Sequence, residues 1–328
     1  MAANCPHCGG VLIPGQPLCT ECGKPARDLA PAGGTGSGAG SGPASATARG
    51  SDAAPQSPRR DKQKDFALVG RTVASKYKVL DVLGQGGFGT VYLVEITAGM
   101  VGERVAMKVL PEELSSKPAF RNQFLNEIRV AMRVVDRYIA QIRDVGTTED
   151  GLLYYTMDLC AGVTLAQIIR DEGRLPITRT LLIVLNVLSG LQTAHAAGII
   201  HRDLKPANIM VQNQGGKDTV RILDFGIATA IQTGERQKGF AGSPHYMPPE
   251  QFMGETIGFY TDLYAIGVIL YECVTGQRPY TGSTAQEVFK GLKSRVPTPL
   301  HALAPEASGF PGLSELVMKA IERNPQQR

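Results

Sequence analysis

The sequence predicts an α+β fold, in which a small β-rich part precedes a larger, mostly helical part. Residues 77–83 and 91–96 alternate as strands do, on either side of a glycine-rich turn. Residues 178–197 are rich in Leu, Ile and Val over the length of a long helix, and a second apolar run covers 263–274. The first 65 residues differ in composition from the rest, which indicates a separate cysteine-rich module and a linker.

The composition is typical of a soluble globular protein with room for two or three domains, since 43 % of its 328 residues are apolar and 20 % are charged. The formal net charge of +4 is too balanced to indicate a nucleic-acid or membrane-surface partner. No apolar run reaches the roughly 18 residues needed to span a bilayer, and the N-terminus lacks the apolar stretch of a signal peptide. We therefore expect a cytoplasmic protein without a membrane segment.

Four of the six cysteines form two Cys-x-x-Cys-Gly pairs, Cys5 with Cys8 and Cys19 with Cys22. Each pair brings two thiolates within reach of one tetrahedral Zn²⁺, and four thiolates leave no open position, so the zinc is expected to be structural. Residues 1–25 therefore resemble a zinc ribbon in a reducing compartment, and free or redox-active thiols are the alternative. Such ribbons bind proteins or nucleic acid, and the sequence does not indicate which ligand this one has.

The stretch 26–69 consists mainly of Gly, Ala, Ser and Pro, with hardly any large apolar side chain. Burial of so little apolar surface does not offset the entropy lost on ordering, so we expect a flexible linker. The second domain then covers 70–328 and divides into a part at about 70–159 and a part at about 160–328.

The turn between the first two strands reads G-x-G-x-x-G-x-V. In such a turn, small residues let main-chain N–H groups come close to phosphate oxygens. A dinucleotide-binding fingerprint shares these glycines but leads into a helix, whereas a second strand follows here. A plain glycine-rich hairpin turn is the other alternative. The residues of the motif are Gly84, Gln85, Gly86, Gly87, Phe88, Gly89 and Val91.

A third strand over 104–110 contains the run Val-Ala-Met-Lys, which ends at Lys108. Apolar residues then recur at helical spacing over 119–135, and Glu127 lies on this predicted helix. A lysine in a strand is usually solvated, so a functional role for Lys108 depends on a carboxylate that holds it. Glu113 is an alternative to Glu127, although it lies in a predicted loop.

The central stretch is 201–208, which reads H-R-D-L-K-P-A-N, followed after a short predicted hairpin by Asp224-Phe225-Gly226. Together with the glycine-rich turn, the lysine strand and the run G-S-P-H-Y-M-P-P-E at 242–250, these motifs resemble the Ser/Thr protein kinases, in particular the bacterial, eukaryotic-like ones. The resemblance covers about 70–328. It implies a two-lobed protein-kinase fold, with a small β-rich N-lobe and a large helical C-lobe, and a domain that stops short of its usual C-terminal end.

The resemblance implies an enzyme that transfers the γ-phosphate of ATP to Ser or Thr hydroxyls of protein substrates. Asp203 would orient the acceptor hydroxyl and take its proton, and Lys205 would stabilise charge near the γ-phosphate. Asn208 and Asp224 would hold Mg²⁺ or Mn²⁺, which prefer hard oxygen ligands. The hydroxyl of Ser243 would bond to Asp203 and Lys205.

In the small lobe, the same resemblance places Lys108 at the α- and β-phosphates, with Glu127 as its ion-pair partner. Ala106 would be a further nucleotide-binding residue, Met157 would be the gatekeeper, and the main chain from Asp158 to Cys160 would bind the edge of the adenine. A helix is predicted to begin shortly afterwards, near Thr164, which is a plausible N-cap. Simple packing is the alternative for the side chains of Met157 and Cys160.

Further expectations concern the large lobe. Arg202 is typical of kinases whose activation segment is ordered by a phosphate. Thr229 and Thr233 are candidates for self-phosphorylation, and Glu235 is a candidate for a permanent substitute for the phosphate. His195 is expected to pack or cap at the end of its helix. By the same resemblance, the catalytic loop is braced by a carboxylate and a buried ion pair closes the lobe; the residues concerned are Asp262, Glu250 and Arg328.

Two other functions remain open at this point. A pseudokinase scaffold or zinc-ribbon adaptor would lack phosphoryl transfer, which the full set of catalytic side chains disfavours. A small-molecule kinase would not need the 242–250 segment, which in protein kinases docks a peptide.

Overall fold

The computed structural model describes residues 68–225 and 243–328. The chain divides into two units, 1–59 and 60–328, and every described residue belongs to the second. The predicted zinc ribbon and the linker as far as residue 67 lie outside the described residues. The small lobe and the large lobe are both parts of the second unit.

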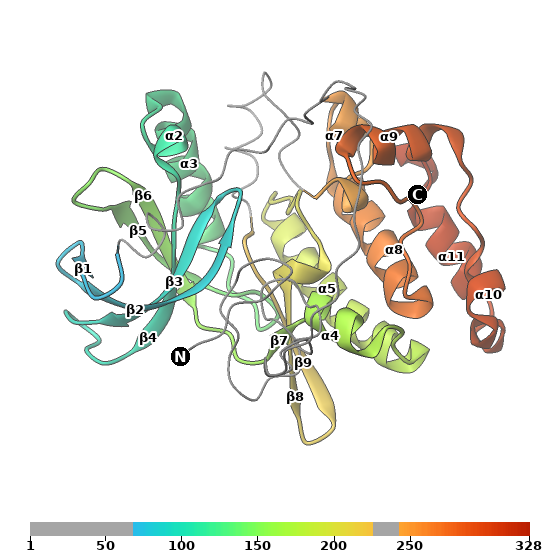
Figure 1. Cartoon of the computed structure of the whole chain (residues 1–328), viewed down its shortest axis with the longest axis horizontal. Helices are drawn as coiled ribbons and strands as arrows, with labels where there is room; N and C mark the ends of the chain where they lie inside the picture. Colours follow the sequence, from blue (N-terminus) through green and yellow to red (C-terminus); the bar gives the residue numbers. More distant parts are fainter. Residues whose placement is uncertain (1–67, 226–242) are drawn as a thin grey trace, which may run out of the picture. The chain divides into compact units, whose positions relative to one another are not determined.

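The small lobe of the described chain is built on a six-stranded antiparallel sheet in the order β1-β2-β3-β4-β6-β5, with α2 and α3 beside it (Figure 1). The predicted hairpin is confirmed, but its first strand extends through the glycines, so that the turn lies between Gly86 and Gly89. The elements are β1 (Thr72–Val73), β2 (Tyr77–Gly86), β3 (Gly89–Ile96), β4 (Arg104–Val109), α2 (Glu112–Ser115), α3 (Pro118–Ala131), β5 (Ile142–Thr147) and β6 (Leu153–Asp158).

Alternation of side chains along the strands separates two apolar cores on the two faces of this sheet. Val105 and Met107 of β4 face a small core that contains Tyr154 of β6. Ala106 of β4 and Tyr155 of β6 belong to the main core, which continues into the large lobe. The face that carries Ala106 is therefore the one turned toward the large lobe.

The large lobe is mostly helical and carries a small sheet in the order β7-β8-β9 (Figure 1). Its strands and longer helices are β7 (Val163–Thr164), α4 (Leu165–Glu172), α5 (Ile177–Ala196), β8 (Ile209–Gln214), β9 (Lys217–Ile222), α8 (Phe259–Thr275), α9 (Ala285–Ser294) and α11 (Leu313–Ala320). Its short helical turns are η1 (Pro206–Asn208), η2 (Pro244–Tyr246), α7 (Pro249–Met253), α10 (Leu300–Leu303), η3 (Pro305–Gly309) and η4 (Pro325–Gln327).

The helix predicted to begin near Thr164 is α4, and its N-terminus is a capping box. The Thr164 side chain accepts from the N–H of Gln167, and the Gln167 side chain accepts from the N–H of Thr164. Two main-chain donors of the first turn are thereby satisfied. The polar pair at the start of the apolar run was a sufficient local signal.

Helix α5 confirms the long apolar helix, and it also corrects one expectation. Among the described residues it is the one helix long and apolar enough to meet the criteria for a membrane span. However, Ile183, Val187 and Leu191 are buried in the main core, and the helix packs against α8 and β9. The core helix of a globular domain meets the same criteria of length and composition.

Helix α3 is shorter than the helix predicted over 119–135, because it ends at Ala131. Beyond it, the N–H groups of Arg133 and Val134 bond three residues back instead of four, so the α-helical ladder is replaced by turns. Glu113 was predicted in a loop and lies in the short helix α2, where its side chain is exposed.

A buried ion pair closes the large lobe, as the resemblance implied. Arg328 donates from Nη1 to Oε1 of Glu250 at 2.6 Å and from Nη2 to Oε2 at 2.9 Å. The two side chains are 0 % and 1 % exposed. Such a bidentate pair is favourable only because both charges are matched, and it ties the last described residue to α7.

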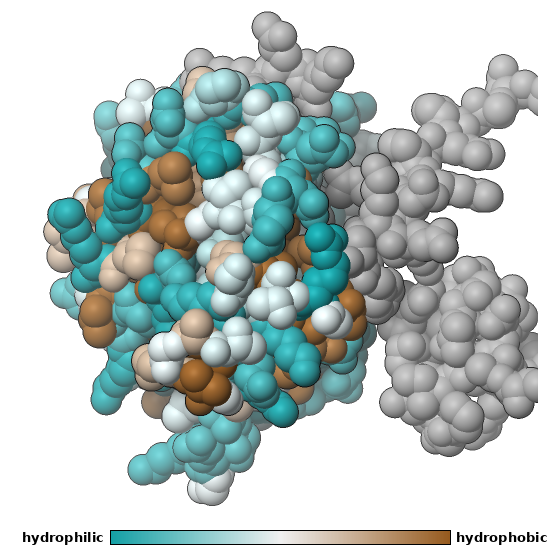
Figure 2. All heavy atoms as spheres, turned by 90° about the vertical axis from the view of Figure 1, so that its left-hand side faces the viewer, coloured by the Kyte–Doolittle hydropathy of each residue, from teal (hydrophilic) through white to brown (hydrophobic). Residues whose placement is uncertain are grey.

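Figure 2 shows the outer face of the small lobe, on which hydrophilic and hydrophobic side chains are interspersed. Met100 and Val101 are among the exposed apolar side chains of this lobe. Scattered apolar residues of this kind are normal on protein surfaces. The candidate site residues lie on the other side of the sheet, toward the large lobe.

Candidate active site

The catalytic loop is held from beneath by Asp262 of α8. Its carboxylate accepts from the main-chain N–H groups of His201 (2.9 Å) and Arg202 (3.0 Å), and Nε2 of His195 lies 2.7 Å from Oδ2. The Asp262 side chain is only 1 % exposed. His195 therefore ends its helix in a bonded, packed position, stacked on Phe259 with ring centroids 4.5 Å apart.

Arg202 has a φ of 67°, in the left-handed region that a non-glycine residue rarely adopts. Asp262 fixes its N–H, and Nε2 of Gln251 donates to its carbonyl oxygen at 2.9 Å. The main chain of Arg202 is thus held on both sides of its Cα, at the N–H by Asp262 of α8 and at the carbonyl oxygen by Gln251 of α7. This conformation directs the next residue, Asp203, toward the site.

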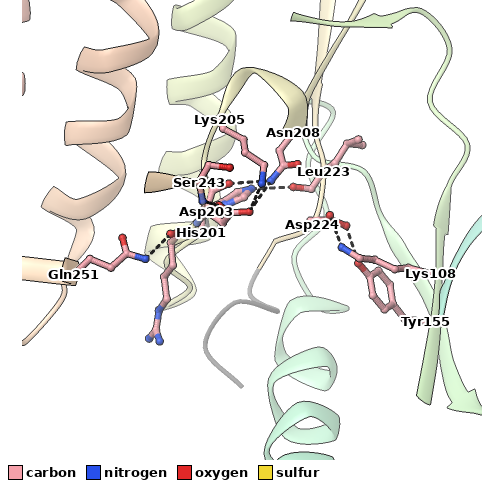
Figure 3. Close-up of polar contacts among 11 residues, drawn as sticks. Lys108, Tyr155, His201, Asp203, Lys205, Asn208, Leu223, Asp224, Ser243 and Gln251 are labelled. Atoms are coloured by element: carbon pink, nitrogen blue, oxygen red, sulfur yellow. Dashed lines mark hydrogen bonds and ion pairs between the residues drawn. The ribbon is translucent and has the colours of Figure 1, made fainter. Parts of the chain in front are cut away.

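Asp203 lies at the centre of a first polar cluster (Figure 3). Nζ of Lys205 donates to Oδ2 of Asp203 at 2.7 Å, and Nδ2 of Asn208 donates to its main-chain oxygen at 2.8 Å. The N–H of Ser243 donates to Oδ1 at 3.3 Å. Four of the predicted site residues are therefore brought together, three from one loop and one from 40 residues further along the chain.

The Ser243 contact differs from the one expected. The hydroxyl was expected to bond to Asp203 and Lys205, but the structure shows the main-chain N–H of Ser243 on Asp203. The segment from Ser243 enters the short helix η2, and this backbone turn points its first N–H at the carboxylate. The contact consequently does not depend on which side chain occupies the position.

Asp224 lies at the centre of a second cluster, drawn at the right of Figure 3. Nζ of Lys108 donates to Oδ2 of Asp224 at 2.6 Å, and the hydroxyl of Tyr155 donates to Oδ1 at 2.7 Å. Burial alone would raise the pKa of Asp224, but the charge and hydrogen bond of Lys108, with the Tyr155 bond, hold that pKa below its ordinary value. Asp224 is therefore a carboxylate at neutral pH.

The predicted ion pair between Lys108 and Glu127 is wrong for this structure, since Lys108 pairs with Asp224. Oε1 of Glu127 accepts instead from Nε2 of Gln123, one turn earlier on α3, at 3.0 Å. The negative charge of Glu127 also acts on the guanidinium of Arg202. Burial lowers the pKa of the Arg202 guanidinium, and the charges of Glu127 and Asp262 partly oppose this shift. Lys108 pairs with Asp224 because Tyr155, on the strand next to that of Lys108, holds the Asp224 carboxylate beside the lysine.

Nε of Arg202 is buried and has no hydrogen-bond partner within the described part of the chain. The proposed partners of Arg202 in the activation segment, Thr229, Thr233 and Glu235, lie outside the described residues. Whether any of them meets the guanidinium stays a prediction.

The register of the small-lobe sheet groups the predicted nucleotide residues. Ala106 lies opposite Met157, and Lys108 lies between Val91 on one side and Tyr155 on the other. Met157 is buried in the main core. The strands thus place Ala106, Met157, Lys108 and Val91 on one face of the sheet, in two cross-strand rows that are two residues apart.

The glycines of the turn differ in whether the fold leaves room for a side chain. Gly89 has a φ of +120°, and a Cβ there would lie 2.1 Å from the carbonyl oxygen of Val109. A Cβ on Gly84, Gly86 or Gly87 would meet nothing within 4 Å. The fold therefore requires glycine only at position 89, and the other three leave open space over the turn, where a phosphate can approach the main chain.

Cys160 follows β6 at the start of the connection to the large lobe. Its thiol lies 3.7 Å from the main-chain oxygen of Asp158, and burial raises its pKa to about 11. The thiol is therefore protonated and unreactive at neutral pH. The packing interpretation of this side chain accounts for its position, and the expected adenine contact concerns its main chain.

The donor set fits magnesium. The Nδ2 atom of Asn208 is bound to the main chain of Asp203, which leaves the amide oxygen for a cation. Asp224 adds a carboxylate with lone pairs beyond those used by Lys108 and Tyr155. Mg²⁺ in phosphate-handling sites typically takes one or two such protein oxygens together with phosphate oxygens.

Two contributors were missed by the sequence interpretation. Tyr155 could have been found, because period-two alternation in its strand puts it on the same face as Met157. Gln251 could not, since nothing local links it to Arg202, which is 49 residues earlier.

The fold and the two clusters define a two-lobed, kinase-like domain. The loop that contains Asp203 has side chains suited to acid–base chemistry, and the Asp224 carboxylate is suited to binding a metal ion. Residues 77–328 match the family model described as the protein kinase domain. The chain therefore belongs to the protein kinase family.

Named relatives agree with this assignment. The chain is 37 % identical over 267 residues to the serine/threonine-protein kinase pkn3 of Myxococcus xanthus, covering 79 % of this chain and 48 % of that protein. It is 38 % identical over 257 residues to the serine/threonine-protein kinase PknE of Mycobacterium tuberculosis, covering 77 % and 43 %. The chain thus spans about half or less of the length of these relatives.

Among solved structures, the crystal structure of the Mycobacterium tuberculosis PknI kinase domain is similar, with a TM-score of 0.62 and 28 % sequence identity. The match covers 79 % of this chain and 92 % of that one. The predicted two-lobed kinase fold is confirmed for the described residues.

Proposed function

We propose that the protein is an ATP-dependent Ser/Thr protein kinase, which transfers the γ-phosphate of Mg-ATP to Ser or Thr hydroxyls of proteins. The observation that carries the proposal is the Asp203 cluster, in which a carboxylate, an ammonium and an amide lie within hydrogen-bond distance in one loop. The names of the relatives support the same substrate class.

Asp203 orients the acceptor hydroxyl and receives its proton. The Lys205 ammonium, 2.7 Å from Oδ2 of Asp203, lies where it also meets charge on the transferred group. Little covalent work is left to the protein in phosphoryl transfer, so the rate depends on how well Asp203 is positioned. That positioning comes from Asp262 through the peptides of His201 and Arg202.

Asn208 and Asp224 supply the oxygens for Mg²⁺ or Mn²⁺. The bound ion neutralises negative charge on the phosphate oxygens. Lys108 binds the α- and β-phosphates, which compete with Asp224 for its ammonium group. Ala106, Val91 and the main chain of Asp158 to Cys160 receive the nucleotide base, and the turn from Gly84 to Gly89 covers the phosphates.

Phosphoryl transfer to the chain itself, at Thr229 or Thr233, is part of this proposal. It would give Arg202, whose Nε lacks a partner among the described residues, an anionic neighbour. We place the protein in the cytoplasm, since the four N-terminal cysteines need a reducing compartment to stay thiolates.

The kinase proposal is tested with labelled ATP and Mg²⁺, using the wild type, Asp203→Asn and a generic Ser/Thr protein as acceptor. We expect label on the acceptor with the wild type and a loss of at least about 100-fold with Asp203→Asn. A wild type that labels neither itself nor the acceptor would support the scaffold alternative. Label that survives the substitution would come from a contaminating kinase.

The zinc ribbon of residues 1–25 is a separate part of the proposal and has its own test. Metal analysis of the purified chain should give one zinc per chain, and Cys5→Ser should lose it. Purified protein without zinc would refute the ribbon and leave the kinase proposal untouched.

A further inference from the structure

The Tyr155 hydroxyl contacts a proposed metal ligand, Asp224, but has no role in the reaction proposed above. Tyr155 is 0 % exposed, lies in the middle of β6 and donates to Oδ1 of Asp224 at 2.7 Å. Its strand partner at the same level is Lys108, which donates to the other oxygen, Oδ2, at 2.6 Å. The two donors thus hold the two oxygens of one carboxylate from adjacent strands (Figure 3).

We infer that Tyr155 is a positioning residue for the metal-binding carboxylate of Asp224. This inference rests on the metal-binding role proposed above for Asp224. Nucleotide phosphates compete with Oδ2 of Asp224 for the three N–H donors of the Lys108 ammonium, which weakens the hold of Lys108 on this carboxylate. The Tyr155 hydroxyl is the other side-chain donor to Asp224 in the described part of the chain, and it keeps the orientation of this carboxylate fixed.

A phenol suits this task better than a second cation. It donates one hydrogen bond and carries no charge, so it orients the carboxylate without repelling a divalent ion. A tyrosine phenol, with an ordinary pKa of about 10, is neutral at pH 7. The rigid strand adds precision, since the cross-strand register with Lys108 fixes the height of the ring.

Packing in the main core fixes the position of the Tyr155 ring. Tyr155 packs against Phe124 of α3, with ring centroids 6.3 Å apart, and both belong to the main core. The hydroxyl therefore reaches Oδ1 of Asp224 from a ring that its neighbours hold in place. Groups that hydrogen-bond to metal ligands typically change metal affinity by about 10- to 100-fold when they are removed.

The test measures how much Mg²⁺ improves the binding of a fluorescent, non-hydrolysable ATP analogue to the full chain. The dissociation constant is determined in EDTA and in saturating Mg²⁺, and the ratio of the two values is the gain due to metal. Tyr155→Phe, which removes one oxygen atom and keeps the ring, should reduce this gain about 10- to 100-fold. Its affinity in EDTA should stay within about twofold of the wild type, because no phosphate contact is removed.

Tyr154→Phe is the matched control. Tyr154 is the neighbouring residue on the same strand and is 4 % exposed, but it faces the other core, where its ring meets Tyr77 edge-on. This variant should keep the full metal-dependent gain. Asp224→Asn is the reference for the metal role and should abolish most of the gain.

The outcomes separate the two proposals. A gain that survives in Tyr155→Phe but is lost in Asp224→Asn would overturn the role of Tyr155 alone. Equal weakening of Tyr155→Phe in EDTA and in Mg²⁺ would also overturn it, since that result indicates packing only. A gain that survives in Asp224→Asn would overturn the metal role itself.

A second measurement is made on the wild type, and the Tyr155→Phe variant serves only to assign its spectrum. Fluorotyrosine labelling of the wild type allows the Tyr155 resonance to be identified among ten tyrosines by its absence in Tyr155→Phe. With the nucleotide analogue already bound, addition of Mg²⁺ should shift the Tyr155 signal and leave the Tyr154 signal in place. An unmoved Tyr155 signal would contradict the inference.

Discussion

The carboxylate of Asp262 is the group whose loss should most clearly separate positioning from stability. It receives three donors: the N–H groups of His201 and Arg202 and Nε2 of His195. In Asp262→Asn one of the two oxygens becomes an NH₂ group, which cannot accept. If the remaining oxygen keeps His201 and His195, the NH₂ group faces the N–H of Arg202, and a buried donor is left without an acceptor.

The size of the effect follows from these contacts. A buried N–H without a partner costs about 1–3 kcal/mol, and the other two bonds lose the strengthening given by a charged acceptor. We therefore expect Asp262→Asn to lower the free energy of unfolding by about 2–4 kcal/mol. Arg202 is held at a φ of 67°, a conformation that costs about 1–3 kcal/mol and persists only while its surroundings enforce it.

The kinetic consequence distinguishes positioning from stability. Once its N–H is unpaired, the Arg202 peptide relaxes and displaces Asp203, the next residue. A shift of about 1 Å in such a group can cost about 100-fold in rate, so kcat should fall by at least that factor. The KM for ATP should change little, because Asp262 does not contact the predicted nucleotide residues of the small lobe.

Asp218→Asn is the matched control for this experiment. Asp218 is also a largely buried carboxylate, with 8 % exposure, and accepts from Nε of Arg179 at 2.7 Å, but it lies on β9 away from the catalytic loop. Chemical unfolding and steady-state kinetics are measured for both variants. If Asp262→Asn lost stability as Asp218→Asn does and kept kcat within about threefold of the wild type, the positioning argument would be refuted.

Two further predictions concern the small lobe. Gly89→Ala should lower the midpoint of thermal unfolding, because its Cβ would lie 2.1 Å from the oxygen of Val109. A Cβ in Gly86→Ala meets nothing within 4 Å, so this variant should keep the midpoint within about 2 °C of the wild type while raising the KM for ATP. Equal unfolding midpoints for the two variants would contradict this prediction. The pKa of Asp144 lies below its ordinary value, since the hydrogen bonds of Lys76 and Tyr77 outweigh burial. Its stabilising effect is therefore full above the unfolded pKa of about 4 and is lost as the pH falls through the lower folded pKa, so the stability difference between wild type and Asp144→Asn should narrow below about pH 4 in urea titrations; a constant difference would refute the shift.

The parts of the fold that the sequence predicted are those with local causes. The hairpin around the glycine turn and the cap at Thr164 depend on residues within about twenty positions of each other, and both are confirmed. The brace from Asp262 and the pair of Glu250 with Arg328 connect distant residues, and they were predicted only because the motifs resemble a family. No periodicity or composition indicated these contacts.

The site was predicted as a set of residues, and its contacts were predicted less well. Ser243 reaches Asp203, but through its main chain, because the turn into η2 decides which atom points at the carboxylate. Gln251 holds Arg202 through a bond between an amide side chain and a carbonyl. Contacts of this kind depend on backbone direction, which residue types in a motif do not specify.

The partner of Lys108 shows most clearly what kind of contact escapes a sequence argument. Lys108 and Tyr155 lie opposite each other on hydrogen-bonded strands, and a register can shift only in whole residues, so their relation is fixed once the strands pair. Glu127 lies on α3, which meets the sheet through apolar side chains such as Phe124 and Ile128. Apolar packing is not directional, so the residue types of α3 do not specify the angle and height at which it packs on the sheet. The position of Glu127 relative to Lys108 therefore does not follow from its place in the sequence, whereas strand pairing sets Tyr155 beside Lys108, where both donate to Asp224.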